Sequence, residues 1–130
     1  VQMMQACAGY EGYELRARRT LADYYVQIGS STEARIQLKA LYDLGERDAA
    51  YNLGVVYGDE PLLAIDWFTK AFEDGNVEAA LRIAEIFEKK KYDADKAYEW
   101  YSKAANAGSE EGAAEANKFR RTMLGHYKRM

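Results

Sequence analysis

The stretch AIDWFTKAFEDG at residues 64–75 recurs 33 residues later as AYEWYSKAANAG at residues 97–108. Five positions are identical, and self-similarity at a fixed period is typical of repeat architectures. In each copy the first Ala, the Trp and the second Ala stand at i, i+3 and i+7, which places them on one helical face. The closing Gly stands where a helix ends in a left-handed residue. The stretch therefore predicts a helix that packs along one face and stops at its glycine.

The same register extends in both directions along the chain. Gly12, Gly45, Gly75 and Gly108 are spaced 33, 30 and 33 residues apart. Alanines recur eleven residues before the last three glycines and five residues after all four, and an aromatic residue stands twelve after the first three. These residues are Ala34, Ala64 and Ala97; Ala17, Ala50, Ala80 and Ala113; and Tyr24, Tyr57 and Phe87. The pattern predicts an all-α array of helix pairs.

This register predicts the bounds of the individual helices. We expect helices over residues 13–28, 32–44, 47–57, 61–73, 77–90, 94–107 and 110–127, with residues 1–10 as the end of a preceding helix. Thr32, Asp59 and Asp93 are candidate N-caps, and Pro61 suits a first turn. The chain then divides into the end of a preceding repeat (1–12), repeats at 13–45, 46–75 and 76–108, and a capping helix at 109–130. Because the pattern is under way at Val1, we expect the chain to be the C-terminal part of a longer array.

Within the first helix of each pair, positions 5, 8, 9 and 12 after the glycine fall on one stripe at 3.6 residues per turn. We expect this stripe to form the core, with small residues allowing close helix contact. Its members in the two middle repeats are Ala50, Leu53, Gly54 and Tyr57, and Ala80, Ile83, Ala84 and Phe87. Trp67 and Trp100 repeat in one register, so we interpret them as packing residues and not as a ligand platform.

Composition narrows the classes of function. The 130 residues are 48% hydrophobic and 30% charged, which indicates a globular domain and not a disordered chain. A net charge of −3 gives no general attraction to nucleic acid. No apolar run approaches the ~20 residues of a membrane span, so we expect no membrane insertion.

The motif Gly-x4-Ala-x2-Leu-Gly-x2-Tyr, followed by Ala-x2-Trp-[Phe/Tyr]-x-Lys-Ala-x3-Gly, resembles the Sel-one-like repeat, a relative of the tetratricopeptide repeat. The likeness is specific in residues 50–75 and 97–108, recognisable in 80–87, and degenerate before residue 45, where Gln37 replaces Trp. The resemblance implies a right-handed α-solenoid of antiparallel helix pairs that serves as an adaptor for protein complexes. By resemblance alone it also favours a periplasmic or envelope setting, such as exopolysaccharide secretion, over a cytoplasmic one.

Residues that could carry chemistry are few. Cys7 is the single cysteine and His126 the single histidine, and a solenoid holds its two ends apart. A structural zinc site needs four N or S ligands, so zinc is not expected. The sequence shows no phosphate-binding loop and no nucleophile elbow. We therefore expect no enzyme, no metal, no cofactor and no small-molecule ligand.

Clusters of basic residues stand at Lys89–Lys91 and in the last helix. Lysines at a helix C-terminus complement the helix dipole, and this is the simpler interpretation. A site for an acidic partner on the basic last helix stays open as the alternative.

A solenoid offers a concave surface lined by the first helix of each pair, and this surface is where we expect a partner protein to bind. Positions 3, 6, 10 and 13 after each glycine lie about 130° from the core stripe. They are Leu15, Arg18, Ala22 and Tyr25; Asp48, Tyr51, Val55 and Gly58; and Glu78, Leu81, Glu85 and Glu88.

The partner-binding prediction comprises seven of these positions, with Tyr51 beside Val55 as the best contact candidate because aromatic residues dominate interface energetics. The seven are Arg18, Tyr25, Tyr51, Val55, Leu81, Glu85 and Glu88. The alternative is that Tyr51 and Leu81 belong to the core between repeats, since periodicity alone does not separate the two cases. We thus expect a non-enzymatic scaffold, or alternatively a regulatory or targeting domain of a larger chain that carries an enzyme.

Overall fold

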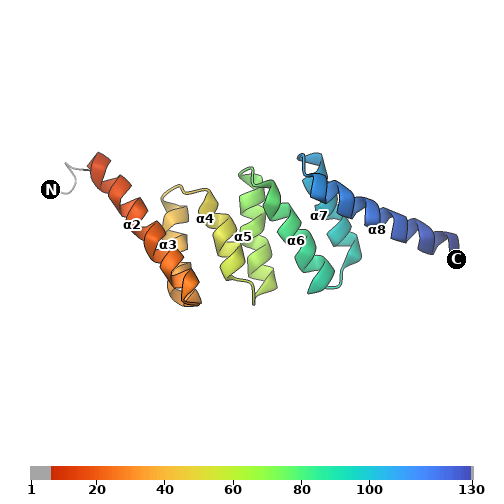
Figure 1. Cartoon of the computed structure of the whole chain (residues 1–130), viewed down its shortest axis with the longest axis horizontal. Helices are drawn as coiled ribbons and strands as arrows, with labels where there is room; N and C mark the ends of the chain where they lie inside the picture. Colours follow the sequence, from red (N-terminus) through yellow and green to blue (C-terminus); the bar gives the residue numbers. More distant parts are fainter. Residues whose placement is uncertain (1–6, 130) are drawn as a thin grey trace.

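A computed structural model describes the backbone of residues 7–129 and the side chains of residues 14–122. This part of the chain is entirely helical, and each helix packs against the one before and the one after it. Figure 1 shows the helices side by side in chain order, with α2 and α8 at opposite ends of the row. Their bounds are α2 Cys7–Gln27, α3 Ser31–Asp43, α4 Asp48–Val56, α5 Pro61–Glu73, α6 Val77–Lys89, α7 Ala94–Asn106 and α8 Glu110–Arg129. The predicted α-solenoid is confirmed.

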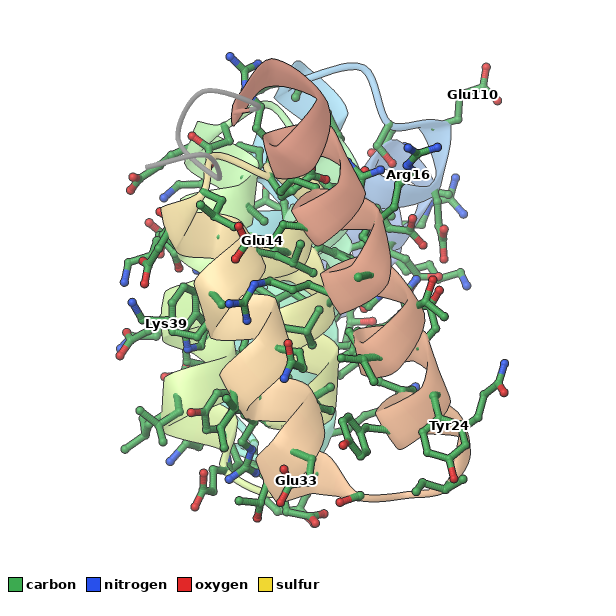
Figure 2. The ribbon with its side chains drawn as sticks, turned by 90° about the vertical axis from the view of Figure 1, so that its left-hand side faces the viewer. Glu14, Arg16, Tyr24, Glu33, Lys39 and Glu110 are labelled. Carbon is green, nitrogen blue, oxygen red and sulfur yellow. The ribbon has the colours of Figure 1, made fainter. Side chains whose placement is uncertain are left out.

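The helices alternate between two layers. We call α2, α4, α6 and α8 the first helices and α3, α5 and α7 the second helices. Seen from the α2 end, α2 and α3 stand in separate layers (Figure 2). The surface formed by the first helices is named the first-helix face below.

Glycines end helices at three positions that the repeat pattern predicts, Gly45, Gly75 and Gly108, and also at Gly29. Gly29, Gly45, Gly75 and Gly108 all have positive φ, between 78° and 107°, which a residue with a side chain adopts at a cost. After each glycine the next backbone N–H returns to a carbonyl five residues earlier, as in Asn76 to Ala71 at 2.9 Å. The chain thereby reverses within the three or four residues between one helix and the next.

Gly12 does not end a helix, which corrects the prediction at that position. The α2 helix runs without a break from Cys7 to Gln27 and includes Gly12. A glycine in a helix interior costs about 1 kcal/mol, which does not force a stop unless a cap and a turn follow. Gly75 and Gly108 are followed by such caps, because Asn76 and Ser109 accept hydrogen bonds from the N–H groups of Ala79 and Gly112.

The N-cap predictions had mixed outcomes. Asp93 caps α7, accepting a hydrogen bond from the Lys96 N–H at 3.1 Å, and Pro61 opens α5 as expected. Thr32 and Asp59 are not caps. The capping position of α3 is Ser30, two residues before Thr32, and that of α5 is Glu60, one residue after Asp59. Neither side chain makes a capping hydrogen bond.

Three clusters of buried side chains follow one another along the array, and the predicted core stripe lies in them. Trp67 is half-buried between the first two clusters and Trp100 between the last two. Each ring meets an aromatic residue of the preceding second helix edge to face, Tyr42 at 5.2 Å and Phe72 at 5.7 Å between centroids. The tryptophans therefore join successive repeats, as their shared register predicts.

Candidate protein-interaction surface

A groove opens on the first-helix face between α4 and α6. It has a volume of about 280 Å³, and more apolar than polar surface lines it. Its lining residues are Gly54, Val55, Gly58, Ala64, Phe68, Arg82, Glu85, Ile86, Lys89 and Lys90. Three of them, Val55, Gly58 and Glu85, belong to the face that the sequence register predicts for partner binding.

The floor of the groove is built by a glycine and a phenylalanine. A Cβ atom at Gly54 would lie 2.6 Å from the Phe68 ring, so the ring packs directly against the α4 backbone. Phe68 is buried, whereas Val55 on the next position of α4 is 52% exposed. An exposed branched aliphatic side chain beside an apolar floor is a feature of interaction sites, although a single such residue is common on any surface.

Tyr51 lies behind the groove, where its ring packs against Phe68 of the groove floor. Its ring is half-buried and meets Phe68 at 5.3 Å between centroids, and it packs against the central core cluster. Burial, followed by the charge of Glu78, raises the pKa of Tyr51 above its usual value. Tyr51 thus supports the groove floor with its ring and keeps only part of its surface for contact.

Charged side chains border the groove on the α6 side. Arg82 pairs with Glu85 at 2.7 Å and with Glu78 at 3.3 Å, both on its own helix. At the end of the groove, Lys90 donates a hydrogen bond to the Gly58 carbonyl at 2.6 Å. This bond links the end of α6 to the end of α4 and closes the groove there.

Beyond Arg82, the first-helix face becomes acidic between α6 and α8. The Tyr101 hydroxyl donates to Glu88 at 3.1 Å. Burial raises the pKa of Tyr101, and the charges of Glu88, Glu85 and Glu115 raise it further. Glu88 of α6 thus accepts the hydrogen bond of this hydroxyl, and the negative charge of Glu115 on α8 also acts on it.

The face that the register assigned on α2 is turned toward the core. Ala22 is buried in the first cluster and Leu15 packs against it. Arg18 donates to Gln37 of α3 at 3.2 Å and pairs with Glu14 of its own helix, so its side chain lies at the α2–α3 contact. Tyr25, on the same stripe, is half-buried and meets Tyr24 edge to face at 5.6 Å. Arg18 and Tyr25 accordingly lie apart from the groove.

Tyr24, which the register placed in the core, is 55% exposed. Figure 2 shows it on the outer side of α2, away from α3, while Glu14 lies toward α3. The register of α2 was counted from Gly12, and Gly12 is not a helix end. The core and outer faces of α2 are therefore exchanged relative to the prediction.

Leu81 also belongs to the core. It is 5% exposed and packs with Ala80, Ala84 and Tyr101 in the last cluster. Because its side chain is buried, Leu81 fits the alternative interpretation, in which it belongs to the core between repeats. Glu85 and Glu88, one and two turns further along α6, are partly exposed.

A larger depression, of about 570 Å³, lies between the second helices α5 and α7. Its apolar floor is the edge-to-face pair of Phe72 and Trp100. The Lys103 ammonium lies 4.1 Å from the Trp100 ring centroid, as Lys70 lies 4.4 Å from that of Trp67. Because these rings are engaged by each other and by a lysine, we interpret the depression as the joint between repeats.

Two basic side chains of the last helix, Lys118 and Arg120, contact other side chains. Lys118 pairs with Glu115 at 3.0 Å, and Arg120 donates to the Tyr98 hydroxyl at 3.2 Å. The Arg120 hydrogen bond lowers the pKa of Tyr98. The side chains of Cys7 and His126 lie outside the described residues. Within the described part, no helix is long and apolar enough to cross a membrane.

Helix pairs stacked in a row, with a groove on one layer, define a helical-repeat solenoid. The family model described as Sel1 repeat matches residues 38–76 and 77–109, more than half of the chain. The chain therefore belongs to the Sel1 repeat family. Sel1 repeats are generally protein–protein interaction modules, and arrays of this kind are typically non-catalytic scaffolds. No curated protein matches the chain.

Proposed function

We propose that this chain is a non-enzymatic scaffold that binds another protein through the first-helix face, with the groove between α4 and α6 at the centre of the contact. The observation that carries the proposal is the exposed Val55 beside the apolar floor made by Phe68, Ala64 and Gly54. Such a floor, bordered by charged side chains, matches the usual anatomy of an interface, with an apolar centre and a polar rim.

The contact residues of this proposal are a reduced set of the original seven. Val55, Glu85 and Glu88 carry it, and Tyr51 contributes its exposed part. Arg18 and Tyr25 are set aside because they lie at the α2–α3 side, and Leu81 because it is buried. The groove accounts for binding without a catalytic group, a metal or a cofactor.

The cellular setting of the scaffold is proposed from family resemblance only. An envelope or exopolysaccharide-secretion complex is the setting favoured by that resemblance. As a regulatory or targeting domain of a longer chain, the array would use the same surface.

A matched pair of substitutions tests the proposed surface. Val55→Arg places a long cation over the apolar floor, whereas Leu62→Arg makes a comparable change at a 66% exposed residue of α5 outside the groove. Both variants and the parent chain would be immobilised and used to capture proteins from the source cells, with quantification by mass spectrometry. Circular dichroism would verify that all three fold equally.

We expect proteins that are captured by the parent and by Leu62→Arg to be lost with Val55→Arg. Truncating a hot-spot side chain costs about 2 kcal/mol or more, which is roughly a thirtyfold loss of affinity. A loss of that size is enough to remove the partner from the captured proteins. Equal capture by Val55→Arg and the parent would place the binding surface elsewhere and contradict the proposal.

A further inference from the structure

The first-helix face beyond the groove carries an excess of negative charge. On α6, Glu78 and Glu85 pair with Arg82, and Glu88 accepts a hydrogen bond from the Tyr101 hydroxyl. On α8, Phe119 meets the Tyr101 ring one turn after Glu115, and the charges of Glu111 and Glu115 act on Arg82 and on Tyr101 respectively. Among the described residues of this patch the cations are Arg82 and Lys118. Five carboxylates from α6 and α8 thus face two cations. We call these five residues, Glu78, Glu85, Glu88, Glu111 and Glu115, the acidic patch.

The acidic patch adjoins the apolar groove through a shared residue. Glu85 lines the groove and pairs with Arg82, and it stands one turn before Glu88 on α6. Two of the cations that line the groove already have partners. Arg82 forms ion pairs with Glu78 and Glu85, and Lys90 donates a hydrogen bond to the Gly58 carbonyl. Lys89 is exposed and lines the groove next to Lys90, at the closed end. A partner that crosses from the groove toward α8 therefore meets an apolar surface first and negative charge next.

The volume of the groove limits the size of the group that it can bind. A volume of about 280 Å³ lies below the range of about 300–1,000 Å³ that is usual for whole small-molecule ligands. It suits one large apolar side chain as an anchor. The remaining contacts of such a partner would fall on the neighbouring helices of the face.

Resting on the proposed function, we propose that the partner is an extended peptide segment that places one apolar side chain in the α4–α6 groove and a lysine or arginine against Glu88 and Glu115. The recognised pattern is an apolar residue and a basic residue within one short extended stretch. Charge complementarity supplies the orientation of the segment.

Selection from a random decapeptide library displayed on phage, against the immobilised chain, tests this proposal. Enriched peptides would be synthesised with a fluorescent label, and their Kd measured by fluorescence anisotropy at low and high salt. Glu88→Gln with Glu115→Gln removes two charges from the acidic patch while leaving an acceptor for the Tyr101 hydroxyl. Glu73→Gln with Glu99→Gln removes two charges from exposed residues of the second helices and is the matched control.

We expect enriched peptides to combine an apolar residue with a lysine or arginine. Their Kd should rise about tenfold with the Glu88 and Glu115 substitutions, since two partly exposed charge contacts are lost, and stay unchanged in the control. Binding should also weaken at high salt, because the Debye length falls from about 10 Å at 0.1 M to about 3 Å at 1 M.

Two outcomes would overturn the inference, and they are distinguishable. Enriched peptides that need Val55 but carry acidic or uncharged residues would leave the proposed function standing and disprove the basic partner. Enrichment that is indifferent to Val55→Arg, or no enrichment at all, would contradict the groove itself and the proposed function with it.

Discussion

At the scale of single residues, the groove depends on the absence of one methyl group. Gly54 of α4 occupies the position that Ala84 holds in α6, and a Cβ there would lie 2.6 Å from the buried Phe68 ring. We predict that Gly54→Ala destabilises the fold by up to about 2 kcal/mol. Alanine gains about 1 kcal/mol in helix propensity, but overpacking against an immobile ring costs about 1–3 kcal/mol and outweighs it. Chemical denaturation of both proteins measures the difference.

A double-mutant cycle separates the clash from other effects. In a Phe68→Leu background the smaller side chain leaves room for the new methyl group, so Gly54→Ala should cost less or stabilise. If Gly54→Ala raises the melting temperature in the parent chain, the ring has moved aside, and the groove floor is more adaptable than its packing indicates.

At the scale of the element, the exchanged faces of α2 have a direct consequence for stability. Tyr24 and Tyr57 are counterparts in the repeat register, yet Tyr24 is mostly exposed while Tyr57 packs against two core clusters and under the Arg35 guanidinium at 4.1 Å. We predict that Tyr24→Ala changes the free energy of unfolding by about 0.5 kcal/mol or less and Tyr57→Ala by about 2 kcal/mol.

The two tyrosine variants control for each other because the chemical change is identical. Thermal and urea unfolding would give the two free energies. Similar losses for both would mean that Tyr24 is covered in solution and that the register counted from Gly12 describes α2 after all.

At the scale of the whole molecule, each helix contacts chiefly its neighbours in sequence. Stability in such arrays is approximately a sum of repeat and interface contributions, so damage should stay local. Leu38 is buried in the first cluster, and Leu38→Ala is expected to cost about 2–5 kcal/mol. We predict that this variant accelerates amide hydrogen exchange in α2 to α4 much more than in α6 to α8.

Ile83→Ala, in the middle of the array, is the control for Leu38→Ala, which lies near one end. Ile83 is fully buried between α5 and α6, so its loss should raise exchange on both sides. Uniform acceleration by Leu38→Ala across all helices would show that the chain unfolds as one cooperative unit.

Several features could be predicted from the sequence because they depend on local contacts. The helix ends at Gly45, Gly75 and Gly108 follow from the one residue type that adopts a positive φ without strain. The core stripe of α4 and α6 follows from helical periodicity, since Leu53 and Ile83 stand at equivalent positions and both are buried. The cap at Asp93 follows from the hydrogen-bonding range of its own side chain.

By itself, then, the sequence determined the repeat, the helices of the middle of the chain and their buried faces, and with these the Sel1 family. The tertiary structure alone decided the continuity of α2 through Gly12, the exchange of its faces, the burial of Leu81 and the hydrogen bond from Tyr101 of α7 to Glu88 of α6. The physical reason is range. Caps and periodicity act within a few residues of one helix, whereas each of these features depends on which neighbouring helix packs against it.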